Sequence, residues 1–168
     1  MEQVRMLAEQ AKRASEILGI LKEEQKNAAL EKMAQALLDH TQEILAANAQ
    51  DLETARQRGT SQAMMDRLAL TPERIAGMAE GIRKVIALPD PVGEVLEEWT
   101  AQSGIRIEKR RVPFGVVGII YEARPNVTSD AAALCIKTGN AALLKGGSDA
   151  LSSNLASAGC LLYTSRCV

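Results

Sequence analysis

The sequence predicts an α/β fold in which amphipathic helices come first, a β-hairpin follows, and the chain then enters the first βαβ unit of a doubly wound sheet. Three observations support this. Only seven charged residues lie after Arg111. Residues 1–111 are therefore predicted to form surface helices, and residues 112–168 to lie in the interior. The hydrophobic period changes from helical to strand-like near Gly93. Beyond residue 112, short apolar runs alternate with helical segments, as in a parallel sheet.

The first 92 residues are predicted to be helical. Apolar residues at helical spacing indicate one amphipathic helix from Val4 to Leu18 and another from Leu30 to Leu38, with a break at Gly19. A third is expected from about Thr41 to a stop at Gly59, where a residue without Cβ suits a left-handed cap.

A fourth helix begins at Thr71. This residue offers an N-cap hydroxyl, and Pro72 and Glu73 supply a proline at the first helical position and an acid in the first turn. The helical pattern continues to Ile86, and the prolines of Leu88–Pro91 end it.

Strand signals begin at Gly93. The runs 95–100 and 105–111 flank the turn signal Gln102–Gly104, which predicts a hairpin over residues 93–112 with Ile105 and Ile107 on one face. Next, Val116–Tyr121 is apolar on both faces, as in a buried strand. A helix over 128–137, a strand over 141–145 and a helix from Ser148 complete a βαβ pattern.

Composition excludes several classes of protein. A net charge of −1 without a basic stripe argues against a dedicated nucleic-acid binder. The apolar run 116–121 is far shorter than the roughly 20 residues of a membrane span, and the N-terminus has no signal core, so we expect a cytoplasmic protein. The three cysteines have no metal-ligand spacing and indicate reduced thiols.

Two stretches of the second part resemble a known family. One is Tyr-Glu-Ala-Arg-Pro-Asn-Val-Thr at residues 121–128, and the other is Thr-Gly-Asn-Ala-Ala-Leu-Leu-Lys-Gly-Gly-Ser-Asp-Ala at residues 138–150. Both are similar to the cofactor domain of the aldehyde dehydrogenase superfamily, and the first resembles, within it, the γ-glutamyl phosphate reductase family. Shorter matches at Asn48–Leu52 and within residues 66–75 extend the resemblance over residues 1–158.

The resemblance implies a truncated, aldehyde-dehydrogenase-like doubly wound fold. Residues 1–92 would be the helical part of the cofactor domain, residues 93–112 a hairpin of the oligomerisation type, and residues 113–158 the start of the NADP-binding βαβ unit. Residues 159–168 do not continue the match and hold two of the three cysteines. We therefore expect a foreign or frameshifted tail there.

The implied activity is NADPH-dependent reduction of L-γ-glutamyl phosphate to L-glutamate 5-semialdehyde and phosphate in proline biosynthesis. In the family, a cysteine thiolate displaces phosphate to leave a thioester, and NADPH then delivers hydride. The family's nucleophilic cysteine lies downstream of the residues present here, so we expect this chain alone to be inactive. Cys135 sits in an apolar helical run and is predicted to be a core residue.

The resemblance also assigns cofactor-binding residues. They lie at the ends of the two predicted strands and are Ile120, Tyr121, Lys145, Gly146 and Ser148. Lys145 corresponds to a lysine that binds the adenosine ribose in the superfamily and can meet a 2′-phosphate, although a lone lysine at a strand end is more often simply solvated. The glycines after it allow backbone to approach a ligand closely, and Ser148 has the alternative role of a helix cap.

Arg124 and Asn126 are the candidate substrate-binding residues. By motif alignment, Arg124 stands where many aldehyde dehydrogenases carry an asparagine that holds the oxyanion, and a guanidinium fork matches a phosphate or a carboxylate. Asn126 would donate a hydrogen bond nearby. The alternative is an arginine packed under the loop and paired with Glu122. His40, alone at a helix start, is expected to be a surface or capping residue.

The implied partners are the small-molecule substrate and further copies of the chain, because the hairpin helps to join subunits in this superfamily. Association with a glutamate 5-kinase is a further implied partnership. Two alternatives stay open: a non-catalytic fragment that binds a nucleotide or a subunit, and another aldehyde or acyl-CoA dehydrogenase.

Overall fold

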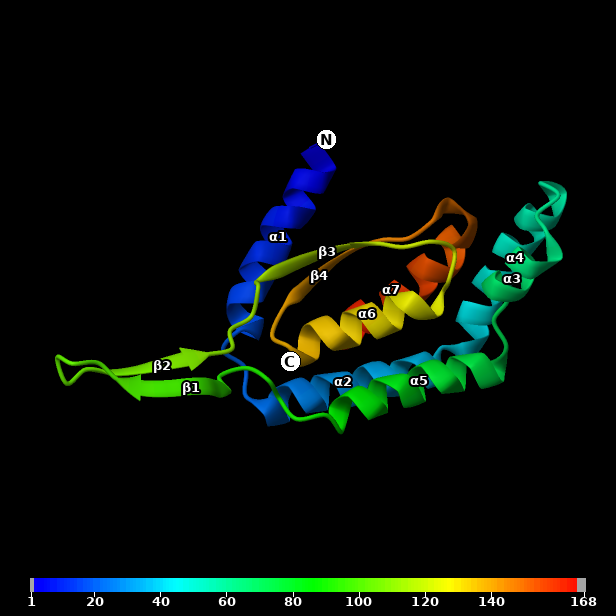
Figure 1. Ribbon diagram of the computed structural model, residues 1–168. Coiled ribbons are helices and arrows are strands. Elements are labelled where there is room, and N and C mark those ends of the chain that lie inside the picture. Colours follow the sequence, from blue (N-terminus) through cyan, green and yellow to red (C-terminus); the bar gives the residue numbers. More distant parts are fainter. Residues whose placement is uncertain (1, 166–168) are drawn as a thin grey trace.

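The computed structural model describes the backbone of residues 2–165 and the side chains of residues 2–161. Its elements, in chain order, are α1 (Glu2–Leu18), α2 (Glu23–Asp39), α3 (Thr41–Gln57), α4 (Gln62–Leu68), α5 (Pro72–Ile86), β1 (Val95–Thr100), β2 (Arg106–Arg110), β3 (Val116–Ile120), α6 (Asn126–Lys137), β4 (Ala141–Lys145), the 3₁₀ turn η1 (Ser148–Ala150) and α7 (Leu151–Ser165) (Figure 1). The predicted α/β class is confirmed.

The core lies between the helices. In Figure 1, α2 and α5 run side by side below α6 and α7. Leu30, Met33 and Leu37 follow the helical spacing that predicted α2, and each is at most 2% exposed. The largest buried apolar cluster joins them to side chains of α3 and α5, namely Ile44, Ile75, Met78 and Ile82.

The βαβ unit has the predicted order. β3 and β4 pair in parallel, from Val116 opposite Ala141 to Ile120 opposite Lys145, and α6 is the crossover between them. Helices α1 and α6 both contact β4. The carboxyl ends of the two strands therefore meet at one edge, the edge at which open α/β sheets bind ligands.

The hairpin projects from the rest of the molecule (Figure 1). Trp99 lies opposite Ile107, and every residue of β1 is exposed. Ion pairs cross between the strands, with Lys109 Nζ 2.8 Å from a Glu97 carboxylate oxygen. Ile105 precedes β2 and its carbonyl accepts from Ala101 N at 2.8 Å, so this residue closes the turn instead of belonging to the strand.

Several boundaries differ from the predictions. The seven-residue helix α4 was not predicted, because it is too short to show a repeated apolar period. Helix α2 begins at Glu23, seven residues before Leu30, and α6 begins at Asn126 instead of Thr128. Ser148 is the first residue of a 3₁₀ turn, and the carboxylate of Asp51 caps the start of α7, so the alternative role of Ser148 as the cap of that helix is not what the structure shows.

Helix α7 also bears on the expected tail. The helix continues without a break through Ser165, so the change of sequence after Ala158 is not a change of backbone conformation. The last three residues of the expected tail, 166–168, lie outside the described residues. A foreign origin for residues 159–168 stays a prediction.

The start of α7 is capped from α3. The backbone N–H groups of Ser152 and Ser153 donate to the Asp51 carboxylate at 3.1 and 2.8 Å, and the Ser153 hydroxyl donates at 2.6 Å. Asp51 is 6% exposed, so these bonds satisfy a buried helix end. Nearby, the Asn48 amide donates to Leu68 O at 2.9 Å. Asn48 and Asp51, which belong to the short stretch Asn48–Leu52 that resembles the family, thus connect α3 to the end of α4 and to the start of α7.

Replacing Gly139 by alanine should destabilise the chain by about 1–3 kcal/mol. Gly139 follows α6 with φ of +72°, and a Cβ there would lie 2.9 Å from Pro113 Cγ and 3.4 Å from Leu18 O. Gly77→Ala is the matched control: no atom lies within 4 Å of its Cβ position, and alanine should stabilise the helix by about 0.5–1 kcal/mol. Urea unfolding measures both, and equal midpoints for the two variants would contradict this account.

Candidate functional site

A cleft of about 570 Å³ opens between the α4–α5 region and the loop that follows β3. One wall comes from residues 66–78, which include Asp66, Arg67 and Arg74. The other wall comes from the start of α6 and the residues just before it, with Arg124, Asn126 and Asp130. The structure thus brings both predicted substrate-binding residues to the same cleft.

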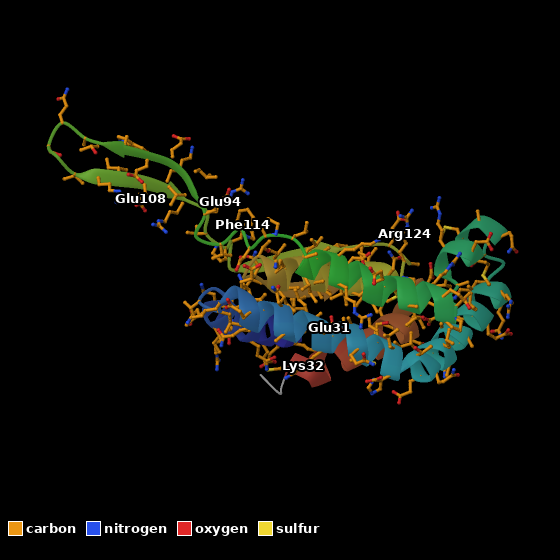
Figure 2. The ribbon with its side chains drawn as sticks, turned by 90° about the horizontal axis from the view of Figure 1, so that it is seen from below. Glu31, Lys32, Glu94, Glu108, Phe114 and Arg124 are labelled. Carbon is orange, nitrogen blue, oxygen red and sulfur yellow. The ribbon has the colours of Figure 1, made fainter. Side chains whose placement is uncertain are left out.

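Arg124 presents an available guanidinium to this cleft. The loop is folded by a hydrogen bond from Arg124 N to Glu122 O at 2.8 Å. Its side chain is exposed and, within residues 2–161, forms no ion pair with Glu122 or any other carboxylate. Figure 2 shows it at the surface, at the end of the molecule opposite the hairpin. The alternative of an arginine paired under the loop is therefore not what the structure shows.

Asn126 and Asp130 lie one turn apart on α6. The Asn126 amide donates to Asp130 Oδ2 at 3.1 Å, so part of its hydrogen-bonding capacity is used inside the helix. Burial raises the pKa of the Asp130 carboxyl, and the bond from Asn126 opposes that shift. Sequence reasoning missed Asp130; the available signal was its spacing of four from Asn126, which places both on one helix face.

The opposite wall adds two arginines that sequence reasoning also missed. Arg74 is held in place, because its Nη1 donates to the carbonyl oxygens of Asp66 at 2.6 Å and Ala69 at 2.5 Å. Those bonds satisfy carbonyls at the end of α4. Arg67 is exposed, and its side chain has no hydrogen-bond or ionic partner within residues 2–161. The cleft therefore holds three guanidinium groups and two carboxylates.

The predicted cofactor residues lie at the carboxyl edge of β3 and β4. Ile120 and Lys145 are paired there, and the bond from Tyr121 N to Lys145 O at 3.1 Å extends the ladder. Ile120 is 82% exposed, and Lys145 and Ser148 are also exposed. This edge offers an apolar surface beside an ammonium group, which suits a nucleotide with its ring and its phosphates.

Tyr121 and Gly146 make contacts within the chain. The Tyr121 hydroxyl lies 2.7 Å from Thr128 Oγ1, which donates to Asn154 Oδ1 at 3.1 Å. A Cβ on Gly146 would lie 2.2 Å from Asn154 Nδ2. The close approach that this glycine allows is therefore to Asn154 of α7. Tyr121 and Gly146 thus contact other residues of the chain and support the sheet edge.

The described cysteines are core residues. Cys135 is 6% exposed, as predicted, and burial raises the pKa of its thiol. Cys160 is likewise buried, and burial raises the pKa of its thiol. The His40 ring N–H at Nδ1 donates to the carbonyl oxygen of Ala36 at 2.9 Å, near the end of α2, which agrees with the predicted capping role. Among the described residues, no group of His, Cys, Asp and Glu could hold a metal ion, and no helix is long and apolar enough to cross a membrane.

Comparison with known proteins gives a consistent picture. The model of the aldehyde dehydrogenase family matches residues 1–162. Curated relatives include the gamma-glutamyl phosphate reductases of Heliobacterium modesticaldum, 58% identical over 146 residues, and Enterococcus faecalis, 55% identical over 151 residues. These matches cover 87% and 90% of this chain but 35% and 36% of the relatives. The chain thus spans little more than a third of their length.

Solved structures agree. The gamma-glutamyl phosphate reductase of Thermotoga maritima superposes with a TM-score of 0.92 and 44% identity, over 95% of this chain and 38% of its own. The gamma-glutamyl phosphate reductase of Saccharomyces cerevisiae superposes with a TM-score of 0.91 and 33% identity, over 96% of this chain and 41% of its own. A probable aldehyde dehydrogenase from Listeria monocytogenes, 13% identical with a TM-score of 0.70 over 98% of this chain and 34% of its own, shares the fold.

Proposed function

The chain belongs to the aldehyde dehydrogenase family, and we propose that it supplies the cofactor edge and part of the substrate cleft of a γ-glutamyl phosphate reductase. The reaction converts γ-glutamyl phosphate, NADPH and a proton into glutamate 5-semialdehyde, NADP⁺ and phosphate, a step of proline biosynthesis. The observation that carries the proposal is the Arg124 guanidinium, which lines the cleft from the loop between β3 and α6 and forms no ion pair within residues 2–161. The names of the relatives favour this activity over that of another aldehyde or acyl-CoA dehydrogenase.

In this proposal, Arg124 binds the anionic end of the substrate. Its fork can donate two parallel hydrogen bonds to a phosphate or a carboxylate. Asn126 keeps one amide hydrogen for a ligand, since its bond to Asp130 uses the other. Neither residue forms a covalent bond; both orient the acyl phosphate and stabilise negative charge on it.

Family membership supports a nicotinamide dinucleotide cofactor, and we infer NADPH. Bound NADPH would supply the hydride. Lys145 and Ile120 suit it best, because they are exposed and adjacent at the carboxyl edge of the sheet, and Lys145 can pair with a 2′-phosphate. Ser148 is the exposed first residue of the turn beyond β4 and can donate from its hydroxyl.

The nucleophile would come from the part of the relatives that this chain does not span. Cys135 and Cys160 are buried in helices and line neither the cleft nor the sheet edge, so neither suits thiolate chemistry. The exposed strands of the projecting hairpin support a homo-oligomeric enzyme, since a second copy would cover their edges. Association with a glutamate 5-kinase stays a prediction.

A chimera tests this function. Residues 1–158 would replace the matched segment of the Heliobacterium modesticaldum relative. The assay follows NADP⁺ reduction with glutamate 5-semialdehyde and phosphate, which is the reaction in reverse. We expect activity within about tenfold of the parent enzyme, because the two segments are 58% identical. A folded chimera without phosphate-dependent activity would overturn the proposed function.

Cofactor binding has a separate test on the chain itself. Titration of NADPH, followed by its fluorescence, should show saturable binding, and Lys145→Ala should weaken it about tenfold through loss of one charged contact. Lys84→Ala, which removes an exposed lysine from α5, is the control. Saturable binding together with an inactive chimera would favour the non-catalytic binding module.

A further inference from the structure

The cleft carries charges of both signs, and several are available to a ligand. Arg67 and Arg124 form no ion pair within residues 2–161. Asp130 is half-buried, and in the same part of the chain its carboxylate has one hydrogen-bond partner, Asn126, and no cation within 4.0 Å. The second carboxylate of the cleft, Asp66, is exposed to solvent and accepts from Gln62 Nε2 at 3.0 Å. Two free guanidiniums and one half-buried carboxylate without a counter-ion therefore line one cavity.

This mixture does not suit a phosphate alone. A carboxylate beside a bound phosphate repels it, and partial burial makes the carboxylate harder to keep ionised. A ligand cation next to Asp130 would offset that cost. The cleft therefore suits a ligand that bears an ammonium and a carboxylate together, as an α-amino acid does.

The α5 wall leaves room for such a ligand. A Cβ at Gly81 would lie 3.6 Å from Asp130 Oδ1, and the Cβ position of Gly77 has no atom within 4 Å. Gly77 also lines the cleft. Gly81 lies one helical turn further along α5, where the helix already comes within contact distance of Asp130, so the open space of this wall is at Gly77.

We propose that this cleft binds the amino-acid end of the glutamyl substrate, with Asp130 accepting hydrogen bonds from the α-ammonium and Arg67 pairing with the α-carboxylate. Arg124, in the loop between β3 and α6, is left for the acyl phosphate at the reacting end of the same molecule. Asp130 and Arg67 then determine specificity for an aldehyde that carries an α-amino-acid group over aldehydes that lack the ammonium or the carboxylate. The assignment rests on the proposed function and deepens it.

Truncated substrates test each contact in the chimera. Glutamate 5-semialdehyde is compared with 5-oxopentanoate, which lacks the ammonium, and with 4-aminobutanal, which lacks the carboxylate. In Asp130→Asn, kcat/KM for the semialdehyde should fall about tenfold more than kcat/KM for 5-oxopentanoate. In Arg67→Ala, kcat/KM for the semialdehyde should fall about tenfold more than kcat/KM for 4-aminobutanal. Asp39→Asn and Arg13→Ala, both on exposed helix faces outside the cleft, are the controls.

The outcomes separate this inference from the proposed function. An active chimera in which the Asp130 and Arg67 variants lose equal activity toward all three aldehydes would overturn the inference and leave the function standing. A rise confined to the KM for phosphate would also overturn it, because the cleft would then bind phosphate alone.

A second measurement does not depend on catalysis. In NMR titrations of the 168-residue chain with L-glutamate and with glutarate, only L-glutamate should shift the backbone amide of Asp130 strongly. Asp130→Asn should remove the difference between the two ligands. Equal shifts with both ligands, or none at Asp130, would overturn the inference even if the chimera is inactive.

Discussion

Arg124→Ala in the chimera is expected to lower kcat/KM for the phosphate-dependent reaction by about 10²–10³-fold, the effect of removing one strong donor to a developing anion. The side chain is free of ion pairs in the described part of the chain, so the variant removes a ligand contact and leaves no buried carboxylate behind. In the reverse direction, phosphate and the semialdehyde are separate substrates. A rise in the KM for phosphate would place the guanidinium on the phosphate, and a rise in the KM for the semialdehyde would place it on the carboxylate.

Arg124→Lys sharpens this test. Lysine keeps the charge but loses the planar fork, so it should recover only part of the lost kcat/KM. Arg13→Ala removes an exposed arginine from α1 and should match the unsubstituted chimera. Unchanged kcat/KM in Arg124→Ala would show that the substrate does not contact this residue, and the role assigned to it would be wrong.

Lys26→Ala is expected to destabilise the chain by about 3–5 kcal/mol, because it leaves a largely buried carboxylate without its partner. Lys26 is fully buried and forms an ion pair with Asp90, whose side chain is 13% exposed. Asp90 also accepts from Val92 N at 3.0 Å. The pair therefore fixes the start of α2 to the segment that leads into the hairpin. Urea unfolding of the chain measures the loss.

Two further variants isolate the cause. Lys26→Met combined with Asp90→Asn removes both charges, so it should recover much of the stability lost in Lys26→Ala. Lys12→Ala is the surface control: its side chain is 68% exposed and lies 4.0 Å from Glu16, so the change should stay within about 0.5 kcal/mol. A loss in Lys26→Ala no larger than in this control would contradict a structural role for the pair.

Sequence and structure agree most closely where the signal is local. The apolar spacing of Leu30, Met33 and Leu37 predicted α2, and Thr71 with Pro72 predicted the start of α5, where Thr71 Oγ1 accepts from Arg74 N at 3.2 Å. Each of these patterns depends on residues within two helical turns. Helix α4 was missed because seven residues hold less than two full turns.

The candidate site divides in the same way. Arg124 and Asn126 come after β3, and Lys145 is the last residue of β4, so the sequence could predict their place near the carboxyl edge of the sheet. Arg67 and Asp130 lie on helices 63 positions apart in the numbering, and no repeat or motif shared by the two segments signals that they face one cleft.

The sequence by itself determined the α/β class, most helices, the hairpin, the βαβ order and the resemblance to a family. These features depend on the hydrophobic period, the helix caps and short motifs, and each of these involves only residues close together in the chain. Only the tertiary structure decided that Asp51 caps α7 about a hundred residues away, that Gly146 accommodates Asn154, and that Asp130 and Arg67 line the same cleft. Such contacts depend on how the helices pack, and packing joins side chains whose separation in sequence carries no period.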